Sequence, residues 1–192
     1  MSRVAHPAGP RYADVLPADH PPAPPADLNA LEAGIWPRNA TRDAVRFSLA
    51  RLLPGQAADI DPEKIARHHL GNPAYAVRYA HARAASGVRW AATLGAEAVP
   101  RCLPADPGEL ALLDALSWLP ERVATAARRG RPDEFARYLE ELASITIATL
   151  SSASHPGSAR APGTDRLALA RAARAGLAAS LGLLGVSAPD RL

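Results

Sequence analysis

Three observations predict that this sequence forms an all-α protein folded as a helical bundle. Apolar residues recur at three- and four-residue spacing over long stretches, and a capping residue or a proline stands at the start of most of them. No segment shows sustained strand alternation closed by hairpin turns. A chain of 192 residues with 48% hydrophobic content can bury one sizeable core but is short for two full domains.

The domain organisation follows from a change in composition near residue 28. Residues 1–28 contain seven prolines, in stretches such as "PADHPPAPPAD", and little periodic apolar pattern. Such a composition is typical of a disordered or extended lead. We expect the helical domain to occupy residues 29–192.

The first two helices have start and stop signals of one kind. Thr41 or Asn39 is placed to cap a helix through "RDAVRFSLARLL", which Pro54-Gly55 would end. Asp61-Pro62 puts a capping carboxylate before a proline at the first helical position, and this opens "PEKIARHHL" as far as Gly71.

The later helices repeat these signals. Asp106-Pro107 opens "PGELALLDALSWL", and we expect Pro120 to interrupt or restart that helix. Pro132 begins "PDEFARYLEELASITIATL", and Thr164 or Asp165 begins "RLALARAARAGLAASLGLLGV".

The remaining helix begins at Asn72-Pro73 with "NPAYAVRYAHAR", and its faces carry different types of side chain. At about 100° per residue, one stripe holds small residues suited to close packing, and these are Ala76, Val77, Ala80, Ala84, Gly87 and Val88. A second stripe consists of Tyr75, Tyr79, Arg83, Ser86 and Trp90. Arg78, His81 and Arg89 point elsewhere, toward solvent or a neighbouring element.

The second stripe has two interpretations. Aromatic rings beside an arginine offer flat surfaces for bases and a guanidinium for phosphate. Rings at helical spacing also pack commonly as a second core face. The pattern alone leaves both open.

Charge is distributed unevenly along the chain. Residues 38–89 hold nine basic and four acidic residues, whereas residues 97–141 hold nine acidic and six basic ones. Residues from 155 onward are again basic, with five arginines and two aspartates. A polyanionic partner would prefer the two basic regions.

Several classes of function are disfavoured. Cys102 is the only cysteine, so neither a disulfide framework nor a thiolate metal cage is expected. The six histidines show no metal-like spacing with carboxylates, and no nucleophile elbow or paired-carboxylate site is apparent, so we expect no metal and no cofactor. No signal peptide is recognisable, and the longest apolar stretch, residues 175–186, is too short to span a bilayer. A soluble, cytoplasmic protein without a membrane partner is the expectation.

Four separated stretches resemble the C-terminal, DALR-type anticodon-binding domain of arginyl-tRNA synthetase. "RDAVRFSLAR" resembles the family's "DALR" helix, and "DIDPEKIARHHLGNPAYAVRYAHAR" resembles the segment that ends in "NPVYYVQYAHAR". "LLDALSWLPERVATAARRGRPDEFARYLEELA" is similar to the middle helices, and "RLALARAARAGLAASLGLLGVSAPDRL" is similar to the C-terminus. The resemblance covers about residues 42–192.

The resemblance implies a helical bundle that docks the anticodon arm of arginine tRNA. In the family, the "YAHAR" helix and the C-terminal tail contribute to the surface for the anticodon loop. Together with the ring stripe, this nominates as tRNA-binding residues Tyr75, Tyr79, His81, Arg83, Trp90, Asp190, Arg191 and Leu192.

The departures from the family pattern keep a second hypothesis open. Tyr75-Ala76 stands where the family tends to carry paired tyrosines, and "SITIATL", residues 144–150, replaces a cluster of aromatic residues and histidine. A degenerate paralogue could use such a bundle to bind protein, for example a catalytic synthetase, or could act in a tRNA-dependent biosynthetic pathway.

Catalysis by this polypeptide is not expected. The sequence leaves no room upstream of Asp43 for a nucleotide-binding domain with HIGH-like and KMSKS-like motifs. Lys64 is the only lysine, so neither a KMSKS loop nor a Walker-A motif can be present. We therefore predict a non-catalytic tRNA-binding protein.

Overall fold

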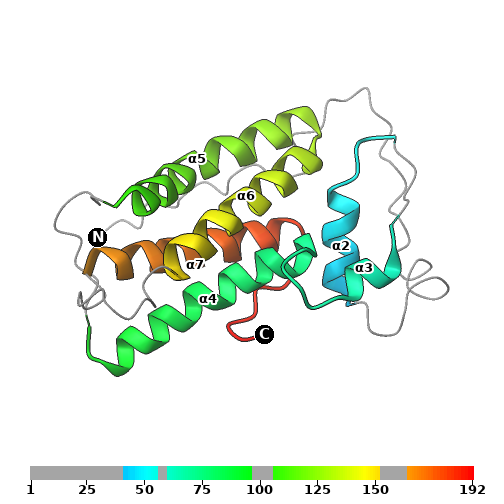
Figure 1. Cartoon of the computed structure of the whole chain (residues 1–192). Helices are drawn as coiled ribbons and strands as arrows, with labels where there is room; N and C mark the ends of the chain where they lie inside the picture. The colour runs from blue at the N-terminus through cyan, green and yellow to red at the C-terminus, as the bar shows by residue number, and fades with distance from the viewer. Residues whose placement is uncertain (1–40, 56–59, 97–105, 152–163) are drawn as a thin grey trace, which may run out of the picture.

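The computed structural model describes residues 41–55, 60–96, 106–151 and 164–192, and over these ranges the chain is all-helical (Figure 1). The helices are α2 (Arg42–Ala50), α3 (Pro62–Ala66), α4 (Pro73–Thr93), α5 (Pro107–Arg129), α6 (Pro132–Ser151) and α7 (Thr164–Leu183). The boundary expected at residue 28, the alternative cap Asn39 and Cys102 lie outside the described residues.

The predicted N-caps are confirmed at four helices. The Thr41 hydroxyl accepts a hydrogen bond from the Ala44 amide at 3.3 Å. Asp61, Asn72 and Asp106 accept bonds in the same way from amides in the first turns of α3, α4 and α5. Each cap satisfies donors that have no partner within the helix, so local sequence sets where these helices begin.

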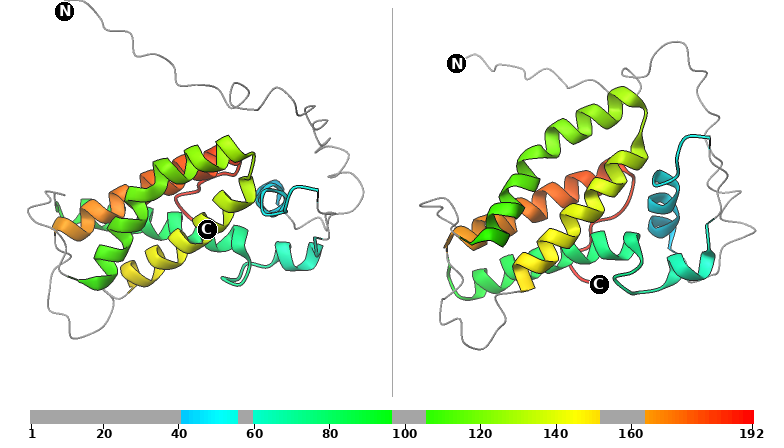
Figure 2. Two further views of the ribbon diagram at one scale, coloured as in Figure 1. Left: turned by 90° about the horizontal axis from the view of Figure 1, so that it is seen from above. Right: turned by 45° about the horizontal axis from the view of Figure 1, so that its top comes forward.

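Two expectations about helix ends are wrong. Pro120 neither interrupts nor restarts a helix, because α5 continues through it to Arg129. Proline removes one backbone donor and crowds the preceding turn, which bends a helix without necessarily ending it, and Figure 2 shows α5 changing direction along its length. The second helix ends at Ala66 and does not continue to Gly71, because Arg67 is already extended.

The four long helices form the body of the protein, with α2 and α3 at one end (Figures 1 and 2). Helix α4 packs against α7, α6 and α2, while α5 packs against α6 and α7. The largest fully buried apolar side chains come from five helices and are Phe47, Val77, Leu112, Leu139, Leu142, Leu177 and Leu181.

Small residues allow the close approach of the long helices. Ala80 and Ala84 of α4 and Ala173 of α7 are completely buried. At Gly176 of α7, an added Cβ would lie 3.2 Å from a methyl carbon of Leu119 on α5. The alanine-rich composition therefore serves packing, because short side chains bring helix axes together.

The turn between α5 and α6 is fixed by glycine and a buried ion pair. Gly130 ends α5 with a φ of 60°, which suits glycine. Arg131 then donates two hydrogen bonds, of 2.7 and 2.8 Å, to the fully buried carboxylate of Asp133. These bonds lower the pKa of Asp133 against the opposing effect of burial.

Candidate nucleic-acid interface

Helix α4 presents three faces about a third of a turn apart. Val77, Ala80, Ala84 and Ala91 form the buried core face. The ring face carries the stripe Tyr75, Tyr79, Arg83, Ser86 and Trp90. The third face carries Arg78, His81 and Arg89. These three residues contact the C-terminal tail, residues 184–192.

The ring face begins with a stack of three rings. The ring centroids of Tyr75 and Tyr79 lie 5.9 Å apart with their planes 20° from parallel. His68 extends the stack from the preceding loop, with its centroid 5.6 Å from that of Tyr75 and an interplanar angle of 17°. Both tyrosines are half-buried and His68 is exposed. We call these three residues the ring ladder.

Asn72 holds the loop that carries His68. Its side-chain oxygen caps α4, while its side-chain amide donates to the carbonyls of Ile65 at 2.9 Å and Arg67 at 2.8 Å. These two bonds take up carbonyls at the end of α3 and turn the chain away from a helical path. His68 is consequently free of α3 and can lie against Tyr75.

Arg83 and Trp90 continue the ring face toward the other end of α4. Arg83 is half-buried, and its guanidinium contacts the carbonyl of Leu150 on α6 at 3.5 Å. Trp90 is 64% exposed. The ring face therefore offers a half-buried aromatic stack, an arginine one turn further on and an accessible indole.

His81 lies away from the ring face and beneath the tail. It is 2% exposed, and its Nδ1 lies 3.0 Å from the carbonyl oxygen of Pro189. The ring is therefore positioned to hold the tail.

Two arginines fix Asp190, and they come from α4 and α7. Arg89 donates to the backbone carbonyl of Asp190 at 2.8 Å, and Arg174 pairs with its carboxylate at 3.1 Å. Arg191 and Leu192 beyond it are exposed. Of the three terminal candidates, Asp190 is a structural anchor, while Arg191 and Leu192 are presented to solvent.

The start of the tail is held by the "DAVR" sequence of α2. Asp43 accepts hydrogen bonds from the backbone and hydroxyl of Ser187 and pairs with Arg78 at 3.4 Å. Arg46 donates to the carbonyl of Gly185 at 2.7 Å. The acidic and basic ends of this short motif thus tie the C-terminal tail to the N-terminal end of the described chain.

Sequence reasoning missed His68, Arg89 as a tail contact and the role of Asn72 beyond its cap. The adjacent histidines His68 and His69 were expected within a helix, and only the early end of α3 brings His68 to Tyr75. An asparagine before proline signals a cap, but nothing local signals its two further bonds.

The replaced segment "SITIATL" does not form an exposed apolar surface. Ile145, Ile147 and Leu150 are half-buried and pack against the core, while the exposed positions are Ser144 and Ala148. The apolar residues of this segment therefore serve mainly the core.

The described ranges hold neither a metal-like cluster nor a membrane-spanning helix. Within them, no three His, Cys, Asp or Glu side chains are grouped so as to hold a metal ion. None of the helices in these ranges has the length and apolar composition to cross a bilayer.

Arginine–tRNA ligases are among the relatives of this chain in sequence. The ligase of Frankia alni is 39% identical over 158 residues, and that of Kineococcus radiotolerans is 40% identical over 157 residues. Each match covers 78% of this chain but only 29% and 28% of the ligase, respectively. The chain thus spans less than a third of the length of these relatives.

Solved structures agree with the sequence matches. The arginyl-tRNA synthetase of Thermus thermophilus superimposes with a TM-score of 0.66 at 30% identity, covering 81% of this chain and 27% of the synthetase. A chain from Campylobacter jejuni superimposes with a TM-score of 0.68 at 20% identity, which supports the fold alone. A model of the DALR anticodon binding domain matches residues 77–192, which include most of α4 and all that follows. The chain therefore belongs to the DALR anticodon-binding domain family and is homologous to the C-terminal part of arginyl-tRNA synthetase.

Proposed function

We propose that this chain binds tRNA through the anticodon arm, with arginine tRNA as its preferred partner. The observation that carries the proposal is the ring ladder, which lies on the same face of α4 as Arg83 in a domain of an anticodon-binding family. RNA is recognised mainly through unpaired loop bases, which stack on aromatic side chains while arginines neutralise the phosphates.

Tyr79, Tyr75 and His68 are the proposed stacking residues, and Arg83 is the proposed phosphate contact. Trp90 on the ring face and Arg191 in the tail are exposed and are proposed as further contacts. His81 and Asp190 act indirectly, because their bonds fix the tail that presents Arg191 and Leu192.

The proposal includes a non-catalytic role in the cytoplasm, where tRNA is found. The chain corresponds to the anticodon-binding portion of its relatives, and its single lysine, Lys64, belongs to the short helix α3. When the chain is incubated with ATP, arginine and arginine tRNA, we expect no arginyl-tRNA to form. Measurable charging by the purified chain would contradict this part of the proposal.

A fluorescence anisotropy titration with labelled arginine tRNA tests binding directly. Saturable binding at low salt is expected, and Tyr79→Ala should weaken it by about 5- to 150-fold, because stacking contributes about 1–3 kcal/mol per base. Tyr79→Phe keeps the ring and should bind nearly as well as the wild type. Arg83→Ala should also weaken binding.

Trp118→Ala supplies the matched control for loss of an exposed ring. Trp118 is 52% exposed on α5, which packs against α6 and α7. Its removal should leave tRNA affinity unchanged. Absence of saturable tRNA binding at low salt, or equal affinity for the wild type and the Tyr79→Ala and Arg83→Ala variants, would refute the proposal.

The second candidate is a protein-interaction module for a catalytic synthetase. Trp118 and Leu110 favour it, because both are large apolar side chains exposed on α5 and neither belongs to the ring face. Affinity capture from the native cell distinguishes the two functions. Arginine tRNA in the captured material supports the first function, whereas one stoichiometric protein without RNA, lost on Trp118→Ala, supports the second.

A further inference from the structure

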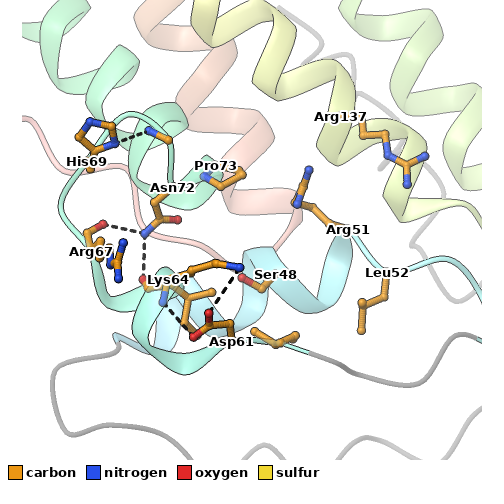
Figure 3. A pocket seen from close by; sticks show the side chains of 13 residues that line it. Ser48, Arg51, Leu52, Asp61, Lys64, Arg67, His69, Asn72, Pro73 and Arg137 are labelled. Carbon is orange, nitrogen blue, oxygen red and sulfur yellow. Dashed lines mark hydrogen bonds and ion pairs between the residues drawn. The ribbon is translucent and has the colours of Figure 1, made fainter.

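A basic pocket lies beside the ring ladder, on the opposite side of the loop that carries His68. It is open to solvent and is lined by residues of α2, α3, the loop of residues 67–71 and α6 (Figure 3). The side chains that matter for its chemistry are Ser48, Arg51, Lys64, Arg67, His69 and Arg137. These residues come from segments far apart in the chain, so the pocket is a product of the fold.

Two of its cations are already neutralised. Arg51 makes a two-pronged pair with Glu140 of α6. Lys64 lies 3.5 Å from the carboxylate of Asp61, whose other oxygen accepts backbone hydrogen bonds at the start of α3. These pairs shape the pocket but add little net charge to it.

Arg67 and Arg137 leave an excess of positive charge. Arg67 is exposed and makes no side-chain hydrogen bond or ion pair to any described residue. Arg137 lies 3.5 Å from Asp133, but Asp133 already accepts two shorter bonds from Arg131. Arg137 thus shares Asp133 with Arg131, which also pairs with Glu134, and the side chain of Arg137 remains 53% exposed.

Neutral groups in the pocket also present donors. The backbone amide of Gly71 donates to Nδ1 of His69 at 2.9 Å. In the neutral imidazole the ring proton therefore resides on Nε2, which is a donor. Ser48 adds a hydroxyl, while the carboxylate oxygens of Asp61 are occupied by the contacts described above.

We propose that this pocket binds a phosphate group. The unpaired guanidinium of Arg67 and the partly neutralised guanidinium of Arg137 supply charge, and the imidazole and hydroxyl supply directed donors for a group with several acceptor oxygens. Arg67 and His69 flank His68 in sequence, so the pocket adjoins the outer end of the ring ladder. An RNA strand with a base on the ladder would place a neighbouring phosphate here, and this source of the phosphate rests on the proposed function.

The pocket itself is tested without RNA. Inorganic phosphate and pyrophosphate are titrated into the protein while NMR follows the backbone amides of residues 67–71. The wild type should show saturable shifts, and the double variant Arg67→Gln/Arg137→Gln should bind at least several-fold more weakly. Arg128→Gln changes the same kind of charge at an exposed site on α5 and should behave as the wild type. Shifts that fail to saturate, or that are unchanged in the double variant, would overturn the assignment.

The source of the phosphate is tested with arginine tRNA. If the RNA backbone occupies the pocket, the double variant should bind more weakly and should reduce the slope of log affinity against log salt by about one per lost contact. An unchanged slope with saturable pyrophosphate binding identifies a free phosphate ligand as the occupant. Saturable pyrophosphate binding by a wild type that does not bind tRNA refutes the proposed function and supports the pocket.

Discussion

At the scale of single residues, the side chain of Asn72 links the end of α3 to the start of α4. It is 7% exposed, and its amide group makes three hydrogen bonds, one that caps α4 and two that end α3. The position of His68 on the ring ladder depends on those two bonds, because they turn the loop away from a helical path. The same side chain thus caps α4 and positions a residue of the candidate interface.

Replacing Asn72 by alanine should destabilise the protein and weaken RNA binding. We expect the free energy of unfolding to fall by about 1–3 kcal/mol, because a cap is lost and two carbonyls, a buried one at Ile65 and a partly buried one at Arg67, lose their donor. Urea denaturation measures this change, and anisotropy titration measures the effect on tRNA.

Asn72→Asp is the informative partner of that variant. Aspartate keeps the acceptor for the Ala74 amide but cannot donate to Ile65 and Arg67. Its stability should fall at least as far as that of Asn72→Ala, because a carboxylate oxygen would face the two carbonyl oxygens in place of the donor. If Asn72→Asp equals the wild type in stability and tRNA affinity, the two donated bonds do not position the loop.

At the scale of elements, the C-terminal tail is held by three helices. Asp43 and Arg46 of α2 bind residues 185–187, and further along the tail Arg89 of α4 and Arg174 of α7 bind Asp190. The contacts are polar and mostly exposed, so they contribute more to the position of the tail than to stability.

Deleting residues 190–192 should separate the contribution of the tail contacts to stability from their contribution to tRNA binding. The outer contacts are lost while the anchors at Ser187 and Gly185 remain, so thermal denaturation should show a loss below about 1 kcal/mol. Binding of arginine tRNA should weaken, with a smaller salt dependence, because Arg191 is removed. Arg174→Gln keeps these residues but frees the Asp190 carboxylate, and it should have a smaller effect on binding. Unchanged tRNA affinity after the deletion would show that the tail is not part of the interface.

The elements also show where sequence reasoning succeeds and where it fails. Caps at Asp61 and Asn72 and the separation of Tyr79 from the core face follow from local chemistry and helical period, and they were predicted. The contacts of Arg78 and Arg89 with the tail join residues more than a hundred positions apart, and no local pattern specifies them. The stack of His68 on Tyr75 depends on the premature end of α3, which a side chain outside that helix imposes.

At the scale of the whole molecule, charge is separated between the two parts of the bundle. Residues 38–89, which contain α2, α3 and the ring ladder, are strongly basic, whereas residues 97–141, which contain α5 and the first half of α6, are acidic. A polyanion is therefore expected to favour the basic segment over the acidic one. The ring ladder and Arg67 of the basic pocket belong to the basic segment, whereas Arg137 reaches the pocket from the acidic one.

The size of the chain leads to a prediction about how much of a tRNA it uses. The curated relatives are more than three times as long as the matched region, and this chain aligns only with their anticodon-binding part. If it binds by the anticodon arm, an isolated anticodon stem–loop of arginine tRNA should compete with the full tRNA at nearly equal affinity, within about threefold or 0.7 kcal/mol.

Competition anisotropy measures the affinity of the stem–loop, and a stem–loop carrying a scrambled loop is the control for charge alone. Because the scrambled stem–loop keeps the phosphates but changes the bases available for stacking, it should compete more weakly. A full tRNA that binds tenfold more tightly than the stem–loop would instead place important contacts outside the anticodon arm.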